Sequence, residues 1–178
     1  SKQEIFNLVV YQIGAIQAAA KVAGTHVHHV KPHGALYNLA SKDEMVATAI
    51  AEAVYAVDPD LILFGLAESE LVWAGEKVGL RVAQEVFADR TYQLDGTLTP
   101  RSHPNAMIHD ADLAVERVLR MITEGKVTTV NGEDIFIQAD TICVHGDEPE
   151  ALEFVRKLRA KLKENKIAIH AIGTVSNP

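Results

Sequence analysis

The sequence predicts an α/β protein built on a parallel sheet, and three observations predict this class. Short apolar runs alternate with longer segments of helical periodicity along the 178 residues, which is the pattern of strands joined by helices. The run Leu61-Ile62-Leu63-Phe64 is apolar throughout, as in a strand buried on both faces. Reactive side chains follow three of the runs, and strand ends build the sites of such proteins. The strands expected suit an open doubly wound sheet or part of a barrel, since a complete (β/α) barrel takes about 250 residues.

In the first half of the chain, recognisable residues mark the ends of the helices. Gly24 is expected to end the first helix, and Pro32 prevents a helix from starting directly after the first strand. Ser41 and Glu44 form a capping box that opens the next helix, and Gly79 ends the third. The expected elements are a helix over 3–22, a strand over 26–30, a helix to about 57, a strand over 61–64, a helix over 68–78 and a strand over 81–87.

The second half begins with a long loop over 88–109, and loops of this length are often functional. Asp110 is expected to cap a helix that Gly125 ends, and Asn131-Gly132 is a strong hairpin signal. The expected elements after the loop are a helix over 110–124, a hairpin of 127–130 and 135–138, a strand over 141–144, a helix over 148–165 and a strand over 167–170.

Length and composition predict one α/β domain over residues 1–178. The formal net charge of -7, from 17 Lys and Arg against 24 Asp and Glu, argues against a nucleic-acid partner, which needs a basic surface. No run of about 18 apolar residues is evident, so we expect no membrane partner. The single cysteine, Cys143, excludes an internal disulfide and fits a reducing compartment, so we expect a cytoplasmic protein.

The first polar cluster is V-K-P-H-G-A-L-Y-N, Val30 to Asn38. Pro32 fixes one dihedral angle and Gly34 permits close backbone approach, so Lys31 and His33 are presented rigidly. His33 could act as a general base or a metal ligand, and Lys31 could stabilise an oxyanion or a phosphate. The alternative is a tight turn whose histidine caps the following helix.

The second cluster is E-V-F-A-D-R, Glu85 to Arg90. Strand alternation puts Glu85 and Phe87 on one face, and a carboxylate buried there must be paired or take part in chemistry. Arg90 could hold a substrate carboxylate through two parallel hydrogen bonds, with Asp89 beside it. The alternative is a structural Glu–Arg or Asp–Arg ion pair. Downstream, Arg101 is a second candidate for binding an anion.

The third cluster is C-V-H-G-D, Cys143 to Asp147. His145 and Asp147 could bind a divalent metal, or could act as a base and the group that orients it. The alternative is that Asp147 caps the next helix and His145 is only its neighbour. Cys143 lies within the expected strand, where a free cysteine is usually buried and inert.

Standard motifs for nucleotide binding are absent from the sequence, which has neither G-x-x-x-x-G-K-[ST] nor G-x-G-x-x-G. It also lacks the G-x-S-x-G nucleophile elbow. His26, His28 and His29 alternate along a strand, which sends His29 to the opposite face from the other two. We therefore interpret these histidines as strand residues rather than as a metal site.

Taken together, the polar clusters resemble those of the LamB/YcsF family. The matching segments are Y-Q-I-G-A at 11–15, H-V-K-P-H-G-A-L-Y-N at 29–38, E-V-F-A-D-R at 85–90, P-R-S at 100–102 and C-V-H-G-D at 143–147. Their order and spacing also fit, and the resemblance covers nearly the whole chain. It implies a parallel (β/α) barrel-like fold of the glycoside hydrolase/deacetylase type.

The resemblance also implies a reaction, the ATP-dependent opening of the lactam 5-oxo-L-proline to L-glutamate, carried out with two partner subunits, B and C. It implies ATP with Mg²⁺ as cofactor and leaves direct metal binding by this chain open. The cations would hold anionic groups, the histidines would transfer protons or bind a metal, and the carboxylates would orient them or bind a cation. The residues implied for catalysis are Lys31, His33, Glu85, Asp89, Arg90, His145 and Asp147, and those for substrate binding are Asn38 and Arg101.

The chain departs from the family pattern at its start. The family's D-L-N-C-D-L-G-E segment and its G-F-H-A-G-D and A-H-P motifs are absent, and the chain opens at Ser1 without an initiator methionine. We therefore expect a fragment of a larger barrel, incomplete at the N-terminus. Two alternative functions remain open: a stand-alone metal-dependent amidohydrolase or deacetylase, suggested by fold analogy, and a non-catalytic binding subunit.

Overall fold

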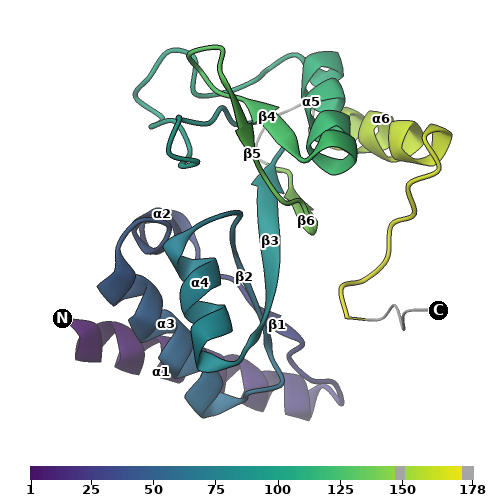
Figure 1. Cartoon of the computed structure of the whole chain (residues 1–178). Helices are drawn as coiled ribbons and strands as arrows, with labels where there is room; N and C mark the ends of the chain where they lie inside the picture. The colour runs from purple at the N-terminus through teal and green to yellow at the C-terminus, as the bar shows by residue number, and fades with distance from the viewer. Residues whose placement is uncertain (147–150, 174–178) are drawn as a thin grey trace. The chain divides into compact units, whose positions relative to one another are not determined.

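The structure, a computed structural model, describes residues 1–146 and 151–173. The chain divides into two compact units, Ser1–Gln84 and Glu85–Pro178, whose helices and strands are labelled in Figure 1. One residue of the third cluster, Asp147, lies outside the described residues. The prediction of a single domain over residues 1–178 stays a prediction.

The first unit follows the predicted alternation of helix and strand. β1 pairs in parallel with β2, with His29 opposite Ile62 and Val30 opposite Leu63. β3 (Arg81–Phe87) begins in this unit and ends in the second. The other elements are α1 (Lys2–Val22), β1 (His29–Val30), α2 (Gly34–Ala40), α3 (Glu44–Val57), β2 (Ile62–Leu66) and α4 (Glu70–Val78).

The sheet keeps its strands in chain order. Its order is β1-β2-β3-β6, where β6 is Thr141–Cys143 and pairs in parallel with β3. A doubly wound sheet reverses its strand order at a switch point, whereas a (β/α) barrel adds each strand beside the one before it. The predicted parallel, barrel-like α/β fold is therefore confirmed.

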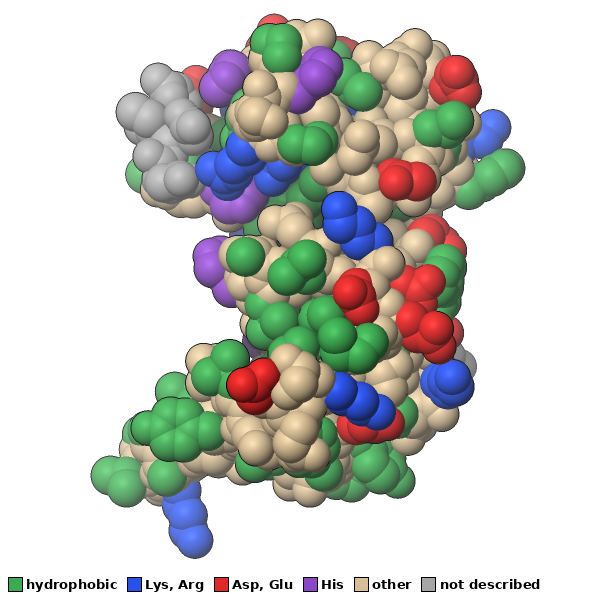
Figure 2. Space-filling view, turned by 90° about the vertical axis from the view of Figure 1, so that its left-hand side faces the viewer, with side chains coloured by type: hydrophobic (Ala, Val, Ile, Leu, Met, Phe, Trp, Pro, Cys, Tyr) green, Lys and Arg blue, Asp and Glu red, His purple; other side chains and the backbone are tan. Residues whose placement is uncertain are grey.

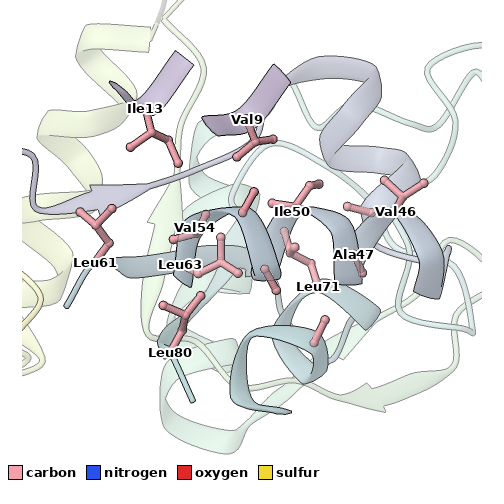
Figure 3. Packing of buried hydrophobic residues seen from close by; sticks show 14 residues of the cluster. Val9, Ile13, Val46, Ala47, Ile50, Val54, Leu61, Leu63, Leu71 and Leu80 are labelled. Atoms are coloured by element: carbon pink, nitrogen blue, oxygen red, sulfur yellow. The ribbon is translucent and has the colours of Figure 1, made fainter. Parts of the chain in front are cut away.

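The first unit packs α1 and α3 around one apolar core. Val9 and Ile13 of α1 lie in a cluster with Ile50 and Val54 of α3 and Leu63 of β2, as Figure 3 shows. All five side chains are buried. Burying a side chain of this size contributes about 1.5–3 kcal/mol, so this contact holds α1 on the unit.

α1 corrects one expectation drawn from the sequence. Its 21 residues make it long and apolar enough to cross a membrane by length and composition alone, although no such segment was expected. A core helix of a soluble protein and a signal sequence pass the same test. In this structure α1 buries Val9 and Ile13 while Tyr11 and Ile16 are exposed, so one of its faces packs on the first unit.

The second unit packs two helices against each other. They are α5 (Ala111–Glu124) and α6 (Ala151–Glu164), and Val118, Phe154 and Leu158 share their apolar core. The predicted ends of α5 agree with the structure. Asp110 Oδ1 accepts a hydrogen bond from the Leu113 N–H at 3.1 Å, and the residue after the helix is a glycine in the left-handed region.

The predicted hairpin is present in the second unit. β4 (Lys126–Thr128) and β5 (Asp134–Phe136) pair antiparallel, with Val127 opposite Ile135. Gly132 in the turn has a φ of 89°, a backbone conformation that favours glycine. The Asn131-Gly132 signal therefore located the turn correctly.

Two local predictions are wrong. Ser41 does not cap α3, because Asp43 Oδ1 accepts the bond from the Val46 N–H at 3.0 Å, while the Ser41 hydroxyl donates to Asn38 O at 2.8 Å. Residues 167–170 form no strand. The Ile167 N–H donates to Leu162 O at 2.9 Å, so the chain closes the end of α6 there instead of adding to a sheet.

Candidate functional site

The second and third polar clusters meet at the carboxyl ends of two neighbouring strands in the second unit. β3 and β6 are parallel with Phe87 opposite Cys143, and the Ala88 N–H extends the ladder to Cys143 O at 3.2 Å. Asp89 and His145 each lie two residues beyond the last strand pair. Their side chains meet, with 2.6 Å between His145 Nδ1 and Asp89 Oδ2. The strand register therefore builds a His–Asp pair from two distant segments.

The His–Asp pair is largely shielded from solvent. The His145 and Asp89 side chains are 19% and 14% exposed. The imidazole stacks on the Phe87 ring with 5.7 Å between ring centroids. The second carboxylate oxygen, Asp89 Oδ1, is buried and has no hydrogen-bond partner within the described residues. It can therefore accept one more hydrogen bond, from water or from a bound molecule.

A small cavity opens beside the pair. Its volume is about 70 Å³, and its polar lining residues are Asp89, His145 and His109. Apolar side chains supply most of the remainder, among them Ile108, Val144 and Phe154. Surroundings of this kind exclude water and strengthen electrostatic interactions.

The pair has the geometry of a general acid–base group. An ionised Asp89 accepts the Nδ1–H of His145 and thereby fixes the tautomer and the orientation of the ring. The other ring nitrogen, Nε2, is then the atom that takes or gives a proton. No group of three or more His, Cys, Asp or Glu side chains that could hold a metal occurs in the described part of the chain.

Tyr92 supports the strand end that carries Asp89, and sequence reasoning missed it. It is fully buried, and its hydroxyl accepts a hydrogen bond from the Phe87 N–H at 2.8 Å. Burial raises the pKa of Tyr92 well above its ordinary value, and the nearby charge of Glu85 adds to this. An aromatic side chain with a polar tip, two residues after a polar cluster, was the available signal.

Arg90 is a buried cation in the long loop. Its side chain donates from Nη2 to Thr99 O at 2.6 Å, and the residue is only 5% exposed. Exposed basic side chains occur beside acidic ones over the face shown in Figure 2, so burial is what distinguishes Arg90. Burial lowers the pKa of Arg90, as does the charge of Arg101, while Asp89 opposes both. Arg101 itself is exposed.

Glu85 is the buried carboxylate that strand alternation predicts. It is 3% exposed and lies opposite Thr141 in the ladder between β3 and β6. Its position on β3 is four residues before Asp89, within the strand and not at its end. The charge of Glu85 raises the pKa of Tyr92, whose hydroxyl accepts the hydrogen bond from the Phe87 N–H.

The first cluster belongs to the first unit. His33 stands at the N-cap position of α2 but makes no side-chain capping bond, and it is exposed. The Lys31 ammonium lies 5.7 Å from the centroid of the Tyr37 ring. Asn38 donates to Gly34 O at 3.1 Å within its own helix. The second and third clusters lie in the other unit, so one site made from all three clusters stays a prediction.

His29 of β1 and His28, which precedes the strand, take part in ring packing. His29 stacks on Phe64 with 4.4 Å between centroids and contacts His28 edge-on at 5.8 Å. Burial lowers the pKa of His29, and the neighbouring charges of His28 and Lys31 lower it further.

Comparison with known proteins gives a consistent result. The chain matches the LamB/YcsF family over residues 1–177. It is 63% identical over 169 residues to the A subunit of 5-oxoprolinase from Oceanobacillus iheyensis, covering 95% of this chain and 66% of that protein. It is 58% identical over 173 residues to the A subunit of 5-oxoprolinase from Bacillus subtilis, covering 97% of this chain and 67% of that protein.

A solved structure shows the same fold. The lactam utilization protein from Thermus thermophilus aligns with a TM-score of 0.87 at 43% sequence identity, over 97% of this chain and 68% of that chain. The chain thus spans about two thirds of the length of the proteins that it matches.

Proposed function

Because the chain belongs to the LamB/YcsF family, we propose that it serves in the A subunit of a 5-oxoprolinase that opens 5-oxo-L-proline to L-glutamate with hydrolysis of ATP. The observation that carries this proposal is the His145–Asp89 pair, with its 2.6 Å contact beside a mainly apolar cavity. Two relatives at 58–63% identity, both named as the A subunit of 5-oxoprolinase, support the choice of substrate.

Opening a lactam requires the proton transfers that a His–Asp pair performs. Water adds to the ring carbonyl carbon, the ring C–N bond breaks, and the leaving nitrogen takes a proton. His145 would take the proton of the attacking water at Nε2 and return one to the nitrogen, with Asp89 holding the ring and stabilising its cationic form. A group of this kind contributes about 10² to 10⁴ in rate.

The amide carbonyl is a poor electrophile, so a second input is needed. We propose that ATP, with Mg²⁺, would activate the carbonyl by transferring its terminal phosphoryl group to the carbonyl oxygen and releasing ADP. Addition of water and cleavage of the C–N bond would then leave an acyl phosphate, which a second water would cleave to the carboxylate and phosphate. We also propose that subunits B and C complete the enzyme in the cytoplasm. The other residues of the clusters are proposed as contacts of substrate or of the anionic groups: Lys31, His33, Asn38, Glu85, Arg90, Arg101 and Asp147.

Reconstitution tests the proposal. The full-length protein is combined with purified subunits B and C, and L-glutamate and ADP are measured with 5-oxo-L-proline as substrate. We expect glutamate only when ATP and all three subunits are present, with ADP formed alongside it. Glutamate formed by the full-length protein alone, without ATP and dependent on an added metal, would instead identify a stand-alone amidohydrolase.

A further inference from the structure

Arg90 carries a buried positive charge that its surroundings do not neutralise. Within residues 1–146 and 151–173, Arg90 makes no ion pair. The one hydrogen bond that the structure gives for its side chain goes to a neutral acceptor, Thr99 O. The carboxylate whose charge acts on Arg90 is that of Asp89, and Asp89 Oδ2 is already bonded to His145. Burying a cation in this way is costly unless an anion completes it.

The loop leaves hydrogen-bonding capacity unused around this cation. Arg90 Nε is buried and has no partner in the described part of the chain, and the same is true of Thr99 Oγ1. Thr99 is 2% exposed and also lines an open hollow with Ser102 and His103. Buried donors without partners are rare in folded proteins, so we expect ordered water or a bound group to use them.

Backbone contacts hold the loop around Arg90 in one conformation. Backbone bridges join Arg90 to Met107 and Tyr92 to Leu98. Arg117 donates to Arg90 O at 3.4 Å and to Thr128 O at 3.0 Å. These contacts fix the backbone on both sides of the guanidinium, so its planar fork is preorganised for a ligand.

We propose that Arg90, assisted by Arg101, binds the carboxylate of 5-oxo-L-proline, and that Thr99 contributes its hydroxyl. This assignment rests on the proposed function for the identity of the substrate. The guanidinium fork matches the two oxygens of a carboxylate. Arg90 directly follows Asp89 in the chain, so a carboxylate held by Arg90 would lie close to the strand end that carries the His145–Asp89 pair.

A phosphate offers similar oxyanion chemistry, so the test must separate the two sources. Full-length protein labelled with ¹⁵N at arginine is titrated with 5-oxo-L-proline, with 2-pyrrolidinone, which is the same lactam without the carboxylate, and with inorganic phosphate. The signal followed is the Nε–H resonance of Arg90, assigned with the Arg90→Lys variant. We expect 5-oxo-L-proline to shift it and 2-pyrrolidinone to leave it unchanged at equal concentration.

Two variants measure the contribution of each cation. Arg90→Lys keeps the charge but loses the fork, and we expect about 10- to 100-fold weaker binding of 5-oxo-L-proline, as for the loss of a hydrogen bond between charged groups. Arg101→Gln is an exposed change that preserves folding, and about two- to fivefold weaker binding is expected. Arg156→Lys, on the exposed face of α6, is the matched control and should bind normally.

Each outcome bears on one claim. A shift of the Arg90 signal with phosphate but not with 5-oxo-L-proline would assign the site to a phosphate and overturn the proposal. An unchanged signal at concentrations of 5-oxo-L-proline that saturate glutamate formation by the three-subunit enzyme would overturn it while leaving the proposed function intact. A shift in a protein whose complex forms no glutamate would leave the carboxylate site standing and remove the proposed function.

Discussion

At the scale of single residues, the buried hydroxyl of Tyr92 supports the geometry of the site. Tyr92 occupies a position where phenylalanine would fill almost the same space, but its hydroxyl satisfies the Phe87 N–H. Phe87 in turn stacks on His145. The phenol therefore supports the strand end from which Asp89 projects and the ring against which His145 lies.

Tyr92→Phe tests this contribution. The substitution leaves the Phe87 N–H buried without an acceptor, so we expect the free energy of unfolding to fall by about 1–3 kcal/mol. The measurement is urea denaturation of the full-length protein, with Tyr55→Phe as control because Tyr55 is 45% exposed. Equal stability of the two variants would show that the hydroxyl of Tyr92 holds nothing in place.

At the scale of secondary-structure elements, α1 has a composition that admits a membrane span and a packing that separates a buried face from an exposed one. Its apolar residues occur on more than one face, so hydropathy alone admits a membrane span. The buried face, with Ile13 at 4% exposure, joins the core of the first unit, whereas Ile16 is 56% exposed. The two isoleucines therefore form a matched pair on one helix.

Ile13→Ala and Ile16→Ala separate the packed face from the exposed one. Removing the buried side chain is expected to lower the free energy of unfolding by about 2–5 kcal/mol, because transfer and cavity terms add. The exposed change is expected to stay within about 0.5 kcal/mol. Denaturation of both variants of the full-length protein is the measurement, and equal losses would contradict the packing of α1 on α3.

Element prediction succeeded where the controlling interaction was local. Asp110 and the Asn131-Gly132 turn act on residues within a few positions, so their effects can be predicted from the sequence. The prediction that Ser41 caps α3 was wrong because a second acceptor, Asp43, lies closer to the start of the helix. The prediction of a strand over residues 167–170 was wrong because strand formation depends on a partner strand. A local apolar pattern does not contain that information.

At the scale of the whole molecule, the order of the strands and part of the site were predictable. Placing polar clusters after strands correctly brought Asp89 and His145 to one edge, because parallel neighbours end at the same level. Their direct pairing depended on the register of β3 with β6, which spacing along the chain does not determine. The burial of Arg90 depended on the path of the 88–109 loop, and neither composition nor periodicity indicates that path.

His145 and Asp89 are proposed to act as one proton-transferring unit, and the chemistry of the site depends on this pair. The direct measurement is the rate of glutamate formation by the full three-subunit enzyme with Asp89→Asn, with His145→Gln and with both changes. We predict that His145→Gln lowers turnover by about 10² to 10⁴, and that the double variant is no slower than His145→Gln, because Asp89 acts through the histidine. His170→Gln, an exposed histidine in the described chain, should leave turnover unchanged. Normal turnover in a folded His145→Gln enzyme, or losses that simply multiply in the double variant, would contradict the account.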